Sequence, residues 1–284
     1  MLLVAGGVLA PFAPERTVAI AATPEPILPD YSGWQRLLDE RLLPLHVYDT
    51  DRTPHIASSL FDYAGLRVDS TWSRRLDRIR AQLLGVAPSR LGAKDRLAWA
   101  INTYNFLAVD RIVRELAARP NGTLTSVRDV KDFFTAPAGT VEGTSYSLET
   151  FEHHFVFVDV DRREGRPLPA GFDPRAHFAL AFGARGCPPL WPEAYRGDRI
   201  DAQLDSVTSD ALRSPSHLRW DPVRRTLETS EIFNWYVVDF GGPAGVMEFV
   251  SRHAAAEVTK DLDAYRVAGS TGTIPWDWTL DQRP

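Results

Sequence analysis

The 284-residue chain contains a single cysteine, Cys187. One cysteine cannot form a disulfide within the chain, and it excludes a zinc site built from several cysteines. Basic and acidic residues nearly balance, at 32 and 37, and no run of five like charges occurs, which argues against a nucleic-acid partner held mainly by phosphate contacts. No apolar stretch reaches the roughly 18 residues of a membrane span.

The common catalytic and binding motifs are also missing. The sequence has no GxxxxGK[ST] or GxGxxG phosphate loop, no GxSxG elbow, no HExxH and no Asp-rich calcium loop. We therefore expect neither a cofactor nor a metal, and the expected partner is an unknown small molecule or peptide.

The first 25 residues differ from the rest of the chain. Apolar and small residues fill 1–10, and Ala19-Ile20-Ala21 before a proline-rich segment resembles a signal-peptidase site. The basic residues that begin a secretory signal are absent. We expect a periplasmic or secreted protein with a signal-like segment at 1–25; a disordered N-terminus of a cytoplasmic protein is the alternative.

Residues 30–284 are expected to form a single α+β domain, mostly helical. Apolar residues occur on nearly all sides of segment 95–118, as in a central helix, which we expect to pack on a small mixed or antiparallel sheet. Strict alternation predicts a strand at 177–182. The remaining patterns predict helices near 34–43, 70–85, 147–154, 198–212, 230–236 and 243–253, and hairpins within 141–148 and 218–227.

Two asparagines lie in the expected central helix. Asn102 and Asn105 are three residues apart and therefore share one face. Burying an amide without hydrogen bonds costs about 1–3 kcal/mol, so both side chains need partners. Either they fasten irregular backbone of a neighbouring loop, or they line a site and hold a substrate carbonyl or a catalytic side chain.

A second polar group is Glu152-His153-His154. Adjacent helical residues point about 100° apart, so the two histidines cannot face one ligand. Glu152 and His153 could form an orienting or acid–base pair, or a pair on the surface.

The third group surrounds Cys187, where two glycines and two prolines predict a rigid turn after the expected strand. Arg185 would lower the pKa of the thiol. Pro188 removes the next N–H group, so Cys187 cannot begin a helix as in papain. Either His177 or His153 could serve as its base, and core filler is the alternative for Cys187.

Taken together, these segments resemble domain of unknown function family 547, found in bacteria and plants. The resemblance rests on Ala98–Leu107, Phe151–His153 and His177–Pro189, where Gly186 replaces the usual serine, and on Ile232–Tyr236 with Asp239-Phe240, and Trp276–Asp281.

The resemblance implies that the polar residues of these segments share one site. On this interpretation the protein is a thiol-dependent hydrolase or transferase acting on an amide or thioester. Cys187, His177, His153 and Glu152 would be catalytic, and Asn102, Asn105 and Arg185 would bind substrate. The alternative is a non-catalytic exported binding or accessory domain in which the cluster is a structural polar network.

Overall fold

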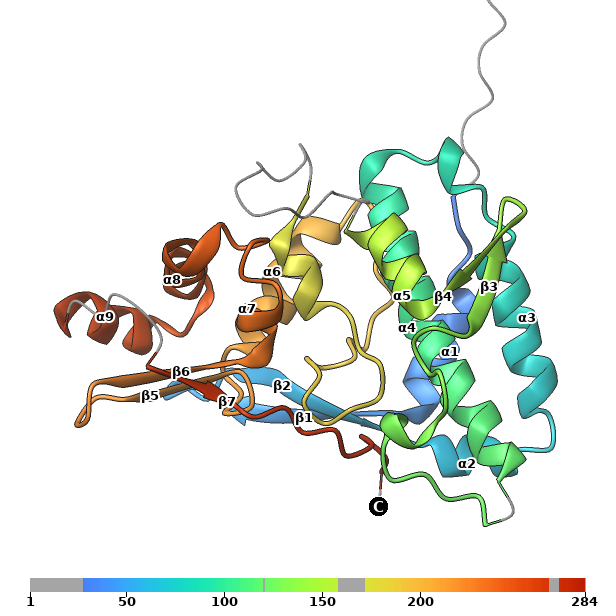
Figure 1. Cartoon of the computed structure of the whole chain (residues 1–284), viewed down its shortest axis with the longest axis horizontal. Coiled ribbons are helices and arrows are strands. Elements are labelled where there is room, and N and C mark those ends of the chain that lie inside the picture. Colours follow the sequence, from blue (N-terminus) through green and yellow to red (C-terminus); the bar gives the residue numbers. More distant parts are fainter. Residues whose placement is uncertain (1–27, 120, 158–171, 266–270, 284) are drawn as a thin grey trace, which may run out of the picture.

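The computed structural model describes residues 28–119, 121–157, 172–265 and 271–283. Helices and short strands make up this part of the chain, and the expected α+β class with a long central helix is confirmed (Figure 1). The signal-like segment 1–25 lies outside the described residues. Among the described residues, no helix is both long and apolar enough to cross a membrane.

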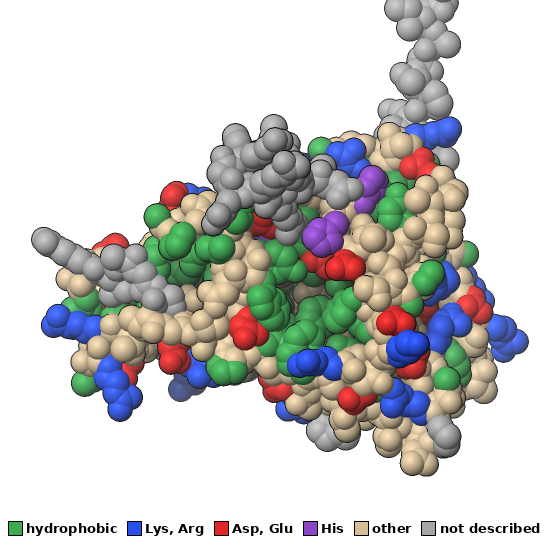
Figure 2. Space-filling view, viewed as in Figure 1, with side chains coloured by type: hydrophobic (Ala, Val, Ile, Leu, Met, Phe, Trp, Pro, Cys, Tyr) green, Lys and Arg blue, Asp and Glu red, His purple; other side chains and the backbone are tan. Residues whose placement is uncertain are grey.

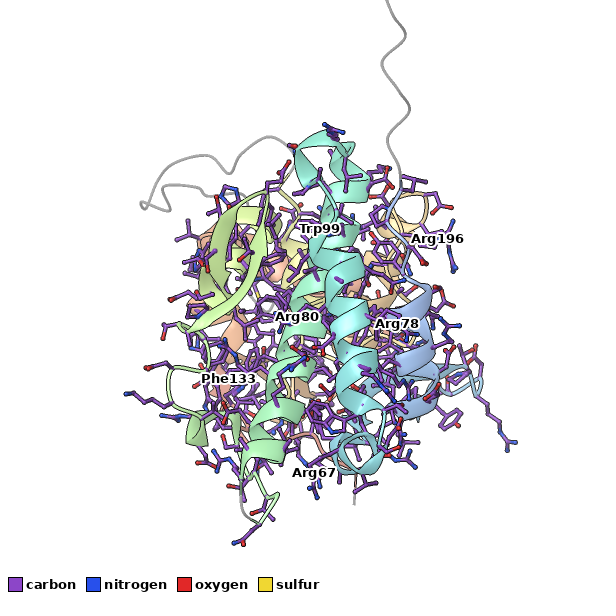
Figure 3. The ribbon with its side chains drawn as sticks, turned by 90° about the vertical axis from the view of Figure 1, so that its right-hand side faces the viewer. Arg67, Arg78, Arg80, Trp99, Phe133 and Arg196 are labelled. Carbon is purple, nitrogen blue, oxygen red and sulfur yellow. The ribbon has the colours of Figure 1, made fainter. Side chains whose placement is uncertain are left out.

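The central helix is α4 (Ala93–Ala118), two residues longer at its start than expected. It is buried on most sides because helices surround it, and α3 (Trp72–Leu84) lies alongside it (Figure 3). The other helices that pack around it are α1 (Ser32–Arg41), α2 (Tyr63–Val68), α5 (Leu148–Phe151) and α6 (Ile200–Ala211), together with a π-helical turn, Glu152–Val156.

A buried carboxylate fastens α3 to α4. Asp110 of α4 is fully buried and pairs with Arg80 of α3 and with Arg114, whose Nε lies 2.8 Å from it. Arg80 also donates a hydrogen bond to the carbonyl oxygen of Ala138. A buried carboxylate is tolerated when charged partners of this kind satisfy it, so these contacts fix the position of α4.

The strands form three small sheets. β1 (Leu42–Tyr48) pairs antiparallel with β2 (Pro54–Phe61), and β3 (Pro137–Val141) pairs antiparallel with β4 (Thr144–Ser147). In the third sheet β6 (Thr226–Ser230) lies between antiparallel β5 (Leu218–Asp221) and parallel β7 (Gly272–Ile274). The β3–β4 and β5–β6 hairpins were predicted from the sequence, whereas β1–β2 was not.

The C-terminal third builds a second hydrophobic cluster beside the first. It contains α7 (Glu231–Trp235), α8 (Gly242–His253) and α9 (Ala256–Tyr265), the last of which the sequence pattern missed. Two 3₁₀ turns flank α4 along the chain: Pro88–Arg90 lies between α3 and α4, and Val127–Asp129 lies between α4 and β3. The two clusters meet at the segment around residue 178.

The prediction of a strand at 177–182 is wrong. A 3₁₀ helix covers Pro174–Phe178, capped by the side chain of Asp173, which accepts a hydrogen bond from the N–H group of Arg175. The backbone that follows is irregular because the side chain of Asn105 bonds to it in place of a neighbouring strand.

The C-terminal segment runs back across the turn that contains Cys187. The N–H group of Gly186 donates to the carbonyl oxygen of Asp277, at 2.8 Å, and the N–H group of Asp281 donates to that of Gly183, at 3.0 Å. A Cβ atom on Gly186 would lie 2.9 Å from the backbone nitrogen of Asp277. Gly186 therefore allows the two backbones to approach this closely.

Candidate functional site

A small cavity of about 40 Å³ lies where α4, the π-helical turn and α7 approach one another. Figure 2 shows a hollow near the centre of this face in which hydrophobic side chains gather, with acidic and histidine side chains beside it. The described residues that line the cavity are mostly aromatic: Tyr104, Phe157, Phe182, Trp235, Tyr236 and Trp276, with Glu152, His177, Leu180, Pro188 and Ile232.

His177 reaches this cavity from the 3₁₀ helix and is held firmly. Its Nε2 lies 2.9 Å from Oδ2 of Asp239, and both side chains are almost completely buried. The imidazole ring also packs between the rings of Phe157 and Tyr236, with centroid distances of 4.2 and 4.0 Å. A carboxylate partner of this kind fixes the orientation and tautomer of a histidine.

Glu152 lies at the start of the π-helical turn and lines the same cavity. The hydroxyl group of Tyr236 donates a hydrogen bond to Oε1 of Glu152, at 3.2 Å. The π-helical turn follows directly after α5. Through its hydroxyl group Tyr236 contacts Glu152, and through its ring it contacts His177, so it touches both acid–base candidates of the cavity.

Both asparagines of α4 bond to loop backbone. Nδ2 of Asn102 donates to the carbonyl oxygen of Tyr195 and its Oδ1 accepts from the N–H group of the same residue, at 2.8 and 2.9 Å. Asn105 does the same across Ala179 and Ala181, with both distances 2.9 Å. Each amide thus donates one hydrogen bond to, and accepts one from, backbone groups that have no strand partner.

Cys187 is buried, and it is not among the residues that line the cavity. Burial raises the pKa of its thiol to about 12, and the nearby charge of Asp281 raises it further, while backbone hydrogen bonding at Phe182 and Ala184 opposes the rise. The expectation that Arg185 lowers this pKa is wrong, because burial dominates and the Arg185 side chain is exposed. The thiol is therefore neutral at physiological pH.

The predicted site residues thus separate into groups. Glu152 and His177 meet at the cavity, whereas Cys187 does not line it. His153 is half-buried on the π-helical turn and does not line it either. Nor do Asn102 and Asn105, which bond to the loops on either side of the Cys187 turn.

A larger and more polar cleft of about 600 Å³ opens beside β2, α6 and α8. His55 bridges two carboxylates there, with Nδ1 2.7 Å from Asp210 and Nε2 3.0 Å from Asp49. Arg213 pairs with the same Asp49. None of the residues predicted from the sequence lines this cleft.

Neither space is a metal centre within the described part of the chain. No group of three or more histidine, cysteine, aspartate or glutamate side chains there has an arrangement that could hold a metal ion.

Comparison with known proteins identifies the segment that carries the candidate residues. Residues 88–210 match the family model described as "Protein of unknown function, DUF547". The resemblance inferred from the sequence is confirmed over this range, while the segments at 232–240 and 276–281 lie beyond it. No curated protein and no solved structure matches the chain.

Sequence reasoning missed several residues of the cavity. Asp239, the partner of His177, and the aromatic residues Trp235, Tyr236 and Trp276 were noted only as parts of family-like segments. Tyr236 and Asp239 lie close together in the sequence, which was the available signal, but nothing in their spacing indicates that they meet a histidine some 60 residues earlier.

Proposed function

We propose that this chain is a non-catalytic binding domain whose aromatic cavity takes a small ligand. In this proposal the asparagine, histidine and cysteine residues that resemble a thiol-active site form a structural polar network. Glu152 and the aromatic side chains, which line the cavity, contact the ligand.

The hydrogen bonding of the two asparagines is the observation that carries this proposal. Each amide uses its oxygen and one of its two donors on loop backbone, and neither side chain lines the cavity, which supports a structural role. Burial of Cys187 supports the same interpretation, because a nucleophilic cysteine needs a lowered pKa and access to its substrate. His177 has Asp239 as its hydrogen-bond partner and stacks between aromatic rings, which suits a fixed wall of a cavity.

Alkylation of the native protein tests this proposal against a thiol-dependent enzyme. Iodoacetamide at pH 8 should leave Cys187 unmodified in the folded protein and should modify it fully in urea. The unfolded sample is the control for reagent activity, since the chain has no other thiol. Rapid native labelling that titrates at or below the free value of about 8.5 would establish a reactive thiolate and refute the structural role.

We also propose that residues 30–284 form one domain and that the protein is exported to the periplasm or secreted. The N–H group of Phe61 donates to the carbonyl oxygen of Asp281, and its own carbonyl oxygen accepts from the N–H group of Arg283; these bonds support the first point, because they tie the C-terminal segment to β2. The Ala19-Ile20-Ala21 segment supports the second. N-terminal sequencing of the protein from fractionated cells should find a chain that begins after Ala21 outside the cytoplasm; an intact cytoplasmic chain would contradict export.

A further inference from the structure

The cleft beside β2, α6 and α8 has the size of a small-molecule site and, among the described residues, shares no lining residue with the aromatic cavity. Its volume of about 600 Å³ lies within the roughly 300–1,000 Å³ of such sites. Parts of the chain far apart in sequence form its walls: His46 of β1, Trp191 ahead of α6, Ser206 and Ser209 of α6, and His253, the last residue of α8. A ligand in the cleft would therefore bind independently of the aromatic cavity.

The aspartate and arginine side chains of the cleft balance one another and are already bonded. Two of each are among the described residues that line it. Asp210 accepts hydrogen bonds from Nδ1 of His55 and from the N–H group of Ile56, at 2.7 and 2.8 Å. The other three each lie close to an opposite charge: Asp205 is 2.6 Å from Arg175, Arg213 is 3.1 Å from Asp49, and Arg252 is 2.6 Å from Glu248. An ion bound here would have to take one of these groups from its present partner.

His253 is a deeply buried side chain whose hydrogen-bonding capacity is open. It is only 8% exposed and lines the cleft, and its ring packs on Phe249 with a centroid distance of 4.6 Å. Neither ring nitrogen has a hydrogen-bond partner within the described part of the chain. Burial lowers the pKa of this histidine below its ordinary value, so at pH 7 the ring is neutral and offers one donor and one acceptor. Buried polar groups normally have partners, and a ligand in the cleft would supply them.

Hydroxyl groups and an indole ring complete the open part of the cleft. Ser206 and Ser209 are three residues apart on α6 and therefore lie on one face of it. Their hydroxyl groups and Nε1 of Trp191 have no hydrogen-bond partner among the residues that the structure describes. Trp191 is half-buried and packs against the first hydrophobic cluster, which holds its ring in place. The cleft thus offers an aromatic ring beside neutral donors and acceptors.

These groups favour a neutral ligand that is rich in hydroxyl groups. A hydroxyl group both donates and accepts hydrogen bonds, as do the serine hydroxyls and the neutral imidazole that it would meet. A purely apolar ligand would cover those polar groups without bonding to them, which is unfavourable. A sugar ring has, in addition to its hydroxyl groups, an apolar face of C–H groups that can pack on an aromatic ring.

We propose that this cleft binds a neutral sugar ring, with Trp191 against its apolar face and His253, Ser206 and Ser209 bonded to its hydroxyl groups. The site lies outside the aromatic cavity, so the inference goes beyond the function proposed above and does not depend on it.

Methyl glycosides of glucose, galactose, mannose and N-acetylglucosamine are the probes, because they vary the arrangement of hydroxyl groups without adding charge. In isothermal titration calorimetry of the whole chain, at least one of them should bind with a dissociation constant below about 10 mM. Sorbitol, which has hydroxyl groups but no ring to pack on Trp191, should bind at least about fivefold more weakly than this glycoside. No binding of any glycoside up to about 10 mM, or equal affinity for sorbitol, would overturn the proposal.

Charged derivatives of the glycoside that binds test the preference for a neutral ligand. Its uronic-acid and amino-sugar forms should each bind at least about threefold more weakly, because the charges of the cleft are already paired and a further charge would be partly desolvated without a partner. Tighter binding of either form than of the neutral glycoside would show that the cleft recognises an ion and would contradict the proposal.

Substitutions locate the binding. His253→Phe keeps a ring to pack on Phe249 but removes both nitrogens, and it should weaken glycoside binding about three- to tenfold. His253→Gln retains a donor and an acceptor and should keep more of the affinity. Ser206→Ala should weaken binding about two- to fivefold. Its matched control is Ser251→Ala, an exposed serine on α8 that does not line the cleft, and this control should bind as the wild type does. Unchanged affinity in both His253→Phe and Ser206→Ala would place the binding elsewhere and overturn the proposal.

Neutral sugar rings occur in free saccharides and in polysaccharides. Cosedimentation with insoluble cellulose or chitin that the methyl glycoside reverses would assign the cleft to a polysaccharide, whereas glycoside binding without cosedimentation would assign it to a free saccharide. Both results support the sugar ring as the ligand and distinguish its source.

Discussion

Replacing Asn105 by alanine should destabilise the protein strongly, although the change is small. The side chain is 1% exposed and makes two hydrogen bonds of 2.9 Å, to the carbonyl oxygen of Ala179 and from the N–H group of Ala181. Alanine would leave both backbone groups buried without partners. Each unsatisfied group costs about 1–3 kcal/mol, so the free energy of unfolding should fall by about 2–6 kcal/mol, a large part of the roughly 5–15 kcal/mol of a typical domain.

Urea unfolding followed by far-ultraviolet circular dichroism measures this change. Asn234→Ala is the matched control, because the Asn234 side chain bonds to Thr273 on an exposed surface. We expect the control to change the free energy of unfolding by no more than about 0.5 kcal/mol. A loss below about 1 kcal/mol for Asn105→Ala would refute the reasoning, since it would mean that the loop finds other partners without cost.

Two predictions concern pH. Burial lowers the pKa of His217 to about 4, so its contribution to stability is complete above its unfolded value of about 6.5 and is lost as pH falls toward 4, by up to about 3 kcal/mol. His217→Leu should lose less stability than the wild type over that range in urea unfolding; equal losses would show that His217 is not responsible. Burial raises the pKa of Asp281 to about 6, so stability from this group is complete below its unfolded value, near 4, and is lost as pH rises to 6. Asp281→Asn can still accept a hydrogen bond from Tyr63. The difference in unfolding free energy between this variant and the wild type should therefore favour the variant more at pH 7 than at pH 4. A difference that does not change with pH would contradict the assignment.

Periodicity in the sequence predicted the elements whose residues pack in one direction. The central helix and the β3–β4 hairpin follow from their own patterns, and the hairpin turn agrees with positive φ at Glu142 and Gly143. The β1–β2 hairpin was missed because the sequence pattern extends the first helix to residue 43, whereas the helix ends at Arg41 and Leu42 begins a strand. The local pattern of apolar residues does not show that the chain stops packing as a helix after residue 41 and begins to pair with β2.

The false strand at 177–182 has a more specific cause. Its alternating residues do not all share a face: Phe178 belongs to the second hydrophobic cluster, whereas Leu180 and Phe182 pack with the first cluster and line the aromatic cavity. Alternation therefore arose from burial in two directions, and side-chain bonds from Asn105 replaced a strand ladder. Alternation in the sequence shows which residues are buried. It indicates a strand only when all the residues of one face pack against the same layer of the structure.

For the candidate site, residue type selected the right segments but did not settle their roles. Asn102 and Asn105 were correctly expected to need partners, and fastening loop backbone was one of the two alternatives. Neither the burial of Cys187 nor the pairing of His177 with Asp239 follows from local pattern, because both depend on the C-terminal segments that fold back over the turn.

The central claim is that residues typical of thiol chemistry support a binding cavity rather than a reaction. The rate at which iodoacetamide labels Cys187 in the folded protein, followed from pH 6 to pH 10, tests it most directly, because this is the chain's only thiol. The account predicts almost no labelling over this range, since burial raises the pKa of the thiol to about 12. Rapid labelling with an apparent pKa at or below the free value of about 8.5 would contradict it.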